Sequence, residues 1–118
     1  MAIIGDLPIG VSSKGVEHWS RPELFKADKV TGAPPDAFTE MGQNWRFPAY
    51  DWERMVRDGY SWWRARMRSM CQYFHGLRMD HVLGYFRLWE LPSHSVTGLG
   101  GRFSPSNPIT KEELDTKG

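Results

Sequence analysis

The chain opens with a short apolar, β-branched run and later contains one long amphipathic segment. The run AIIGDLPIGV (residues 2–11) is interrupted by Gly5 and Asp6, a pattern typical of a buried strand that ends in a loop. After Gly59, apolar residues recur every three or four positions, at Tyr60, Trp63, Met67, Cys71 and Phe74. This spacing predicts one amphipathic helix that reaches about His75 and is closed by Gly76.

The segment between these two patterns, residues 12–50, shows no steady period. It is rich in turn sequences such as GAPPD and RFPAY, so it is predicted to be mostly loop, with a helical turn near RPELF. The following DWERMVRD (residues 51–58) is predicted to form two helical turns. A loop of this length in a compact domain usually serves binding or acts as a lid.

A second strand is predicted within HGLRMDHVLGYFR (residues 75–87), over residues 77–82. Alternation along a strand places Arg78 and Asp80 on one face, and Leu77, Met79 and His81 on the other. We expect Leu77 and Met79 to pack on the preceding helix. The order strand, loop, helix, strand predicts the α/β class, as one βαβ crossover of a barrel or an open sheet.

Two charges on the predicted second strand are unusual for a buried element. An inward-facing charge costs several kcal/mol unless it is paired, so Arg78 and Asp80 are expected to be buried and to pair with each other. A neighbouring cation favours the ionised carboxylate. An ionised carboxylate held at the C-terminal end of a strand suits a nucleophilic aspartate. A purely structural Arg–Asp pair beside a surface histidine remains the alternative interpretation.

Composition narrows the classes of partner. The 118 residues include 15 Lys and Arg against 14 Asp and Glu, a net charge of +1, which argues against nucleic acid and anionic membranes as partners. A nucleic-acid or protein-binding role of the basic aromatic stretch WWRARMR is the open alternative. No apolar run reaches the roughly 18 residues of a membrane span. A single cysteine, Cys71, and no recognisable secretory signal predict a reducing, cytoplasmic location.

Four stretches in order, GDLPIGV, GAPPDAFTEMGQNW, DGYSWWRARM and LRMDHVLGYFRLWELP, resemble the 4-α-glucanotransferases, the amylomaltase or disproportionating-enzyme family. The tail GYFRLWELPSHSVTGLGGRFSPSNP is most similar to the plant cytosolic branch, which acts on maltose and heteroglycans. The resemblance implies a partial (β/α)8 TIM barrel with about two strands, a long βα loop and a crossover helix. Residues 1–118 would be a fragment of the catalytic barrel domain, with no complete domain.

The resemblance also implies site residues and a reaction. Asp80 would be the nucleophile, forming a covalent glycosyl-aspartate in a retaining transfer of α-1,4-glucan segments, and Arg78 would hold it ionised. The substrate, maltose, maltodextrin or heteroglycan, would be bound by Asp6, Asp36, Gln43, Asn44, Trp45 and His81. Aromatic platforms beside hydrogen-bonding side chains suit the apolar faces and hydroxyl rims of glucose. No cofactor is expected, and the histidines show no metal-ligand spacing.

Purely structural roles of individual residues stay open as alternatives. Trp45 could be a loop aromatic that fills the core, and Asp6 could be a turn or helix-cap aspartate. For the pair Trp62 and Trp63, adjacent helical positions point about 100° apart, which predicts Trp63 in the core and Trp62 at its flank. Thr110 and Glu113 are predicted to form a capping box that opens a helix.

The sequence departs from the family in two respects. Arg46 stands where the family usually has glycine, a residue that often serves a positive φ or a close backbone approach. The family strings Glu-Asp-Leu-Gly, which carries the acid/base, and His-Asp-Asn do not occur. Because retaining transfer uses two carboxylates, the isolated chain is expected to be inactive. The alternative function is a non-catalytic glucan-binding remnant.

Overall fold

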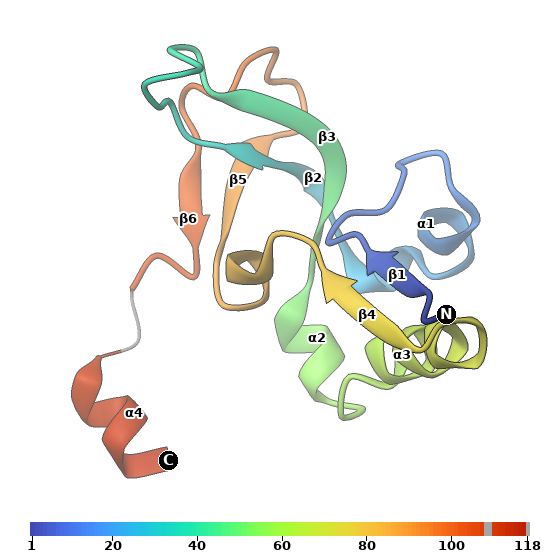
Figure 1. Ribbon diagram of the computed structural model, residues 1–118. Helices are drawn as coiled ribbons and strands as arrows, with labels where there is room; N and C mark the ends of the chain where they lie inside the picture. The colour runs from blue at the N-terminus through green and yellow to red at the C-terminus, as the bar shows by residue number, and fades with distance from the viewer. Residues whose placement is uncertain (108–109, 118) are drawn as a thin grey trace.

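The computed structural model describes residues 1–107 and 110–117, which form a mixed α/β structure with two separate sheets (Figure 1). The strands are β1 (Ile4–Leu7), β2 (Phe25–Ala33), β3 (Gln43–Tyr50), β4 (Gly76–Met79), β5 (Leu88–Pro92) and β6 (Arg102–Ser104). The helices are α1 (Val16–Ser20), α2 (Trp52–Val56), α3 (Ser61–Tyr73) and α4 (Lys111–Lys117), with short 3-10 helices η1 (Pro22–Leu24) and η2 (Val82–Tyr85).

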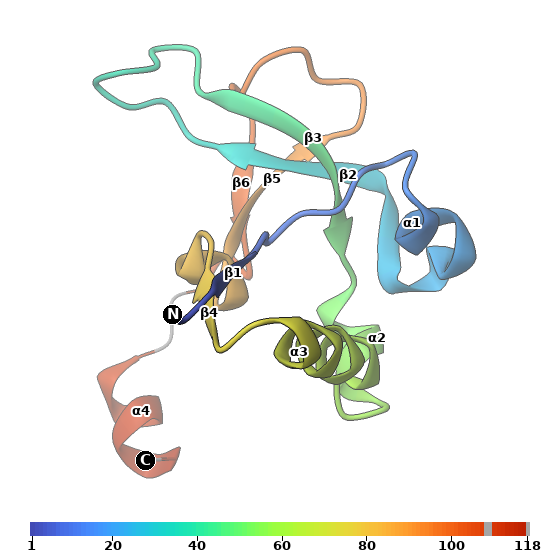
Figure 2. The same cartoon turned by 45° about the vertical axis from the view of Figure 1, so that its right-hand side comes forward.

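The first sheet confirms the predicted βαβ unit. Strands β1 and β4 pair in parallel, with Ile4 opposite Gly76 and Asp6 opposite Arg78. Helix α3 directly precedes β4, as the three- and four-residue period predicted, and Figures 1 and 2 show it below this strand pair. The C-terminal ends of β1 and β4 therefore lie side by side.

The second sheet contradicts the prediction of a long loop over residues 12–50. Strands β2 and β3 form an antiparallel hairpin there, and β5 and β6 extend it to the order β3-β2-β5-β6 (Figure 2). The sequence of β2 and β3 does not show the usual alternation of apolar and polar residues, because β2 is interrupted by register shifts and Pro48 lies within β3. Strand β2 also carries polar side chains, among them Lys26, whose partners lie on other strands.

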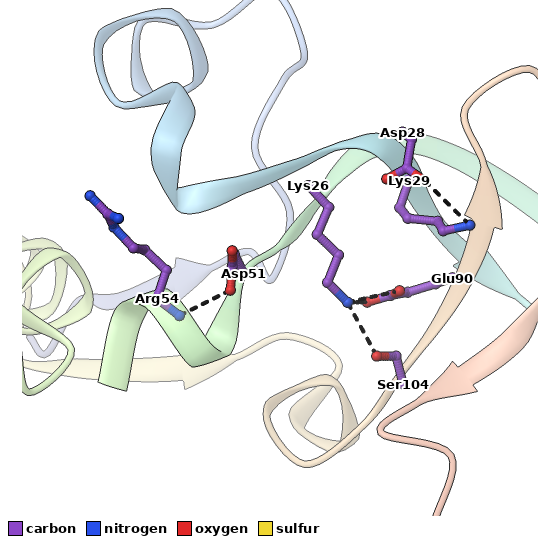
Figure 3. A network of polar contacts seen from close by, with 7 residues as sticks. All are labelled: Lys26, Asp28, Lys29, Asp51, Arg54, Glu90 and Ser104. Carbon is purple, nitrogen blue, oxygen red and sulfur yellow. Dashed lines mark hydrogen bonds and ion pairs between the residues drawn. The ribbon is translucent and has the colours of Figure 1, made fainter. Parts of the chain in front are cut away.

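The contact made by Lys26 joins three strands of this sheet (Figure 3). The Lys26 Nζ atom donates to both carboxylate oxygens of Glu90, at 2.8 and 3.0 Å, and to Ser104 Oγ at 3.3 Å. Glu90 is one of the few buried charged side chains, with 9% of the side chain exposed. A buried carboxylate requires such a partner, so this contact ties β2 to β5 and β6.

The helical predictions hold in outline, with corrections at α3. This helix ends at Tyr73, and Gly76, predicted to close it, is the first residue of β4. Turn η1 and helix α2 lie within RPELF and DWERMVRD, and Thr110 and Glu113 form the expected capping box. Helix α3, however, begins after Tyr60, which has φ 58° and is exposed, as is Cys71. Both residues were predicted on the apolar face. They lie outside it because the buried face of α3 is narrower and centres on Trp63.

The core gathers aromatic rings between α3 and the strands. Trp63 is 5% exposed and Trp62 packs at the edge of the same cluster, as predicted. The Tyr50 ring lies at the centre of the cluster, with ring centroids 5.1 to 5.9 Å from Phe25, Trp52, Trp62 and Trp63. By contrast, Met79 is exposed, so its expected packing on α3 is wrong, whereas Leu77 is partly buried. Within residues 1–107 and 110–117, no helix is long and apolar enough to cross a membrane.

Candidate active site

A cavity of about 500 Å³ opens where the two parallel strands end. It is lined by Pro8, Ile9, Gly10, Trp45, Phe47, Asp80 and His81. The segment 8–10 follows β1, and Asp80 and His81 follow β4. Ligand sites of α/β sheets commonly form at the carboxyl ends of parallel strands, so the position of the cavity agrees with the sequence prediction for Asp80.

The aromatic wall of the cavity is made by Trp45 and His81. Their rings meet edge to face, with centroids 5.1 Å apart and an interplanar angle of 84°. Trp45 is half-buried and therefore presents part of its surface to the cavity. The structure thus brings together three predicted site residues, the adjacent Asp80 and His81 and, from 35 positions before Asp80, Trp45.

The backbone around Trp45 is held by its neighbours. Asn44 Nδ2 donates to the carbonyl of Ser95 at 2.6 Å, and Asn44 Oδ1 accepts from the Arg46 amide at 2.9 Å. Gln43 Oε1 accepts from Trp45 Nε1 at 2.9 Å. The side chains of Gln43 and Asn44, both predicted to bind sugar, therefore make hydrogen bonds that fix the conformation of the Trp45 loop.

Arg46 occupies the left-handed region, with φ 60°. A side chain in this region costs roughly 1–2 kcal/mol because Cβ approaches the carbonyl oxygen. Of the two purposes that a glycine often serves at such a position, a positive φ is the one found here, and the chain adopts it with a bulky residue. The hydrogen bond from the Arg46 amide to Asn44 accompanies this conformation.

The predicted ion pair of Arg78 with Asp80 is present, but it is exposed rather than buried, and Asp6 is a second, closer partner of Arg78. Arg78 Nη1 donates to the two carboxylate oxygens of Asp6 at 2.8 and 2.9 Å, whereas its Nη2 lies 3.7 Å from Asp80 Oδ1. The side chains of Arg78, Asp6 and Asp80 are 64%, 59% and 44% exposed. Asp6 is the nearer partner because parallel pairing puts it directly opposite Arg78.

Asp80 is positioned by a backbone hydrogen bond to the neighbouring strand. The Asp80 amide donates to the carbonyl of Leu7 at 3.1 Å, which continues the β1–β4 pairing by one residue. The next residue, His81, has φ 47°, so the chain turns sharply into η2 after Asp80. Asp80 is therefore presented at the cavity by the end of the parallel pair.

Asp36 is not among the residues that line this cavity. It lies in the β2–β3 connection, where its Oδ1 accepts from the amides of Phe38 and Thr39 and from Thr39 Oγ1, at 2.7 to 2.9 Å. The pKa of Asp36 is lowered, mainly by the hydrogen bond that the Thr39 hydroxyl donates to its carboxylate. In this structure, Asp36 stabilises its own turn.

Sequence reasoning missed a second cavity of about 560 Å³, which also has His81 in its wall. Its surface is mostly apolar, and Phe86, Trp89 and Phe103 contribute aromatic rings. The aromatic density of residues 85–103 was the signal available in the sequence. Among the described residues, no group of three or more His, Cys, Asp or Glu side chains gathers to hold a metal ion.

Comparison with known proteins agrees with the geometry. The family model described as 4-alpha-glucanotransferase matches residues 1–114. The 4-alpha-glucanotransferase DPE2 of Oryza sativa subsp. japonica is 54% identical over 114 residues, which is 97% of this chain and 12% of that protein. The 4-alpha-glucanotransferase of Thermus thermophilus is 40% identical over 107 residues, which is 86% of this chain and 21% of that protein.

A solved structure shows the same arrangement. The amylomaltase from Streptococcus agalactiae in complex with acarbose matches with a TM-score of 0.84 and 35% identity, over 98% of this chain and 24% of that one. The chain thus spans between about an eighth and a quarter of the length of these relatives.

Proposed function

The chain belongs to the 4-alpha-glucanotransferase family, and we propose that it contributes the nucleophile side of a site that transfers α-1,4-glucan segments. The observation that carries the proposal is the position of Asp80, at the end of a parallel strand pair and in one cavity with Trp45 and His81. A carboxylate beside an aromatic wall suits attack on a sugar that stacks on that wall.

The proposed reaction proceeds in two displacements. An Asp80 carboxylate oxygen attacks the anomeric carbon, the bond to the glycosidic oxygen breaks, and a second carboxyl group donates its proton to that oxygen. The product is a covalent glycosyl-aspartate. The 4-hydroxyl of an acceptor sugar then attacks the same carbon, gives its proton back to the second carboxylate and releases Asp80. Two inversions retain the α configuration.

The remaining residues take roles around this step. Arg78 lies 2.8 Å from Asp6 and 3.7 Å from Asp80, so its guanidinium holds the two carboxylates on the same side of the strand pair. Trp45 and His81 contact the bound ring. Asp6, Asp36, Gln43 and Asn44 stay predicted sugar ligands, although each makes an intramolecular contact here. The bond that is broken supplies the free energy for the one that is made, so the transfer itself needs no cofactor.

The proposed substrate is maltose, maltodextrin or a heteroglycan. The solved amylomaltase with acarbose supports a glucan-like ligand at such a site. We also propose that β1 and β4 are neighbouring strands of a (β/α)8 barrel, and that residues 1–118 are part of its catalytic domain. The parallel pairing and the crossover through α3 support this assignment. A cytoplasmic location remains a prediction from the single cysteine.

The alternative, a non-catalytic glucan-binding remnant, would bind sugar with Trp45 and Asp36, and Asp36 does not line this cavity. The presence of Asp80 in the same cavity favours the catalytic role. The acid/base carboxylate belongs to a family string that this sequence lacks, so we expect the isolated chain to release no glucose from maltotriose.

The test uses a chimaera in which residues 1–114 replace the matching segment of the rice relative. We expect the chimaera to release glucose from maltotriose, and Asp80→Asn to lower turnover by several orders of magnitude while maltotriose still binds. Asp28→Asn is the matched control, since Asp28 is exposed and does not line the cavity. A folded Asp80→Asn chimaera with near-normal turnover would show that Asp80 is not the nucleophile.

A further inference from the structure

A buried hydroxyl outside the cavity holds one of its walls. Tyr50 Oη donates to the carbonyl of Ile9 at 2.6 Å, and this hydrogen bond is buried. Tyr50 is the last residue of β3, the strand that also carries Trp45 and Phe47. Ile9 belongs to the segment 8–10 that lines the cavity next to Asp80. One hydrogen bond therefore connects the strand of the aromatic wall to the segment that follows β1.

The segment 7–10 is held at two further points. The carbonyl of Leu7 accepts from the Asp80 amide at 3.1 Å. Gly10 lies so close to the Phe47 ring that an added Cβ would be 2.1 Å from Phe47 Cδ2. The segment is thus joined to Asp80 on one side and to β3 on the other, so it bridges the two sides of the cavity.

The ring and the hydroxyl of Tyr50 serve separable purposes. The ring packs among Phe25, Trp52, Trp62 and Trp63, and a phenylalanine would pack there as well. The hydroxyl donates its proton to the carbonyl of Ile9. Burial raises the pKa of Tyr50, so the hydroxyl keeps the proton that it donates at any pH near neutrality.

We propose that Tyr50 is a positioning residue that sets the separation between Asp80 and Trp45 through the carbonyl of Ile9. The expected effect of Tyr50 on turnover rests on the proposed function. A displacement of the nucleophile by about 1 Å can cost as much as a hundredfold in rate, because the reacting atoms leave the geometry of attack. Binding changes less, since the platform Trp45 and its loop contacts stay in place.

The kinetic test compares Tyr50→Phe with Tyr85→Phe in the chimaera. Tyr85 is the matched control because its hydroxyl is buried and has no hydrogen-bond partner among the described residues. We expect Tyr50→Phe to lower kcat for maltotriose by about tenfold or more with KM changed less than about threefold, and Tyr85→Phe to change neither. Gly10→Ala, which forces the segment away from Phe47, should likewise lower kcat while changing KM little. An unchanged kcat in Tyr50→Phe, or a loss of activity that equals the loss of folded protein, would overturn the proposal.

A second readout is independent of activity. In the 118-residue chain, the Asp80 amide should exchange its hydrogen faster in Tyr50→Phe than in Tyr85→Phe, because the Leu7 carbonyl is less firmly held. Equal exchange in the two variants would contradict the proposed connection. An inactive unmutated chimaera would instead count against the glucan-transfer function, so the two failures can be told apart.

Discussion

The contact between Lys26 and Glu90 offers the sharpest stability test of this fold, and Lys26→Met is the perturbation. The change removes three hydrogen bonds, two to Glu90 and one to Ser104, and leaves a carboxylate that is 9% exposed without its cation (Figure 3). Removing one partner of a fully buried pair costs about 3–5 kcal/mol. Because Lys26 is itself 32% exposed, water screens part of the interaction, and we expect a loss of about 2 kcal/mol.

The assay is urea unfolding of the 118-residue chain, followed by tryptophan fluorescence. With an m value of roughly 1.3 kcal/mol per molar urea for a chain of this size, a loss of about 2 kcal/mol lowers the midpoint by about 1.5 M. The double variant Lys26→Met with Glu90→Met should recover most of the loss, since an apolar pair often replaces a buried ion pair at little cost.

Lys29→Met is the matched control. Its amine lies 3.7 Å from Asp28, whose side chain is 79% exposed, so the change should cost no more than about 0.5 kcal/mol. If Lys26→Met costs no more than Lys29→Met, Glu90 does not depend on Lys26 and the reasoning about the second sheet is wrong.

Three further predictions concern stability. Arg46→Gly should raise the free energy of unfolding by about 0.5–1 kcal/mol, since glycine relieves the positive φ, whereas Arg46→Ala should not; equal melting temperatures of the two variants would contradict this. Trp63→Ala should cost about 3–5 kcal/mol in urea unfolding and Trp19→Ala, at an exposed position, far less; similar losses would place Trp63 outside the core. Hydrogen bonds from Ser61 lower the pKa of Asp58 in the folded chain, so this stabilisation is complete above the unfolded pKa of about 4 and is lost as pH falls through the lower folded value. In Asp58→Asn, the urea midpoint should fall less between pH 6 and pH 3 than it does in the unmutated chain. The same pH dependence in both would show that Asp58 does not contribute this stabilisation.

The elements that the sequence predicted are those with a local cause. The spacing of Trp63, Met67 and Phe74 is enough to place α3, and adjacent helical positions separate the buried Trp63 from the flanking Trp62. These features depend on a few neighbouring residues, so a single sequence reveals them.

What the sequence did not predict depends on contacts between distant segments. Strand β2 looks like a loop because the polar Lys26 has its partner 64 positions away, in Glu90. Asp6 became the partner of Arg78 through the register of two strands 72 positions apart, which alternation within one strand cannot reveal. Likewise, the hydrogen bond from Asn44 to the carbonyl of Ser95 joins residues 51 positions apart.

The most direct test of the central claim is to identify the residue that carries the sugar. The chimaera is incubated with a fluorinated α-glucosyl fluoride, which forms the covalent intermediate but releases it slowly, and its peptides are then analysed by mass spectrometry. The proposed mechanism predicts that the fluoroglucosyl group is attached to Asp80 and that Asp80→Asn abolishes the adduct. An active chimaera whose adduct is attached to Asp6 or to any other carboxylate would contradict the assignment of Asp80 as the nucleophile.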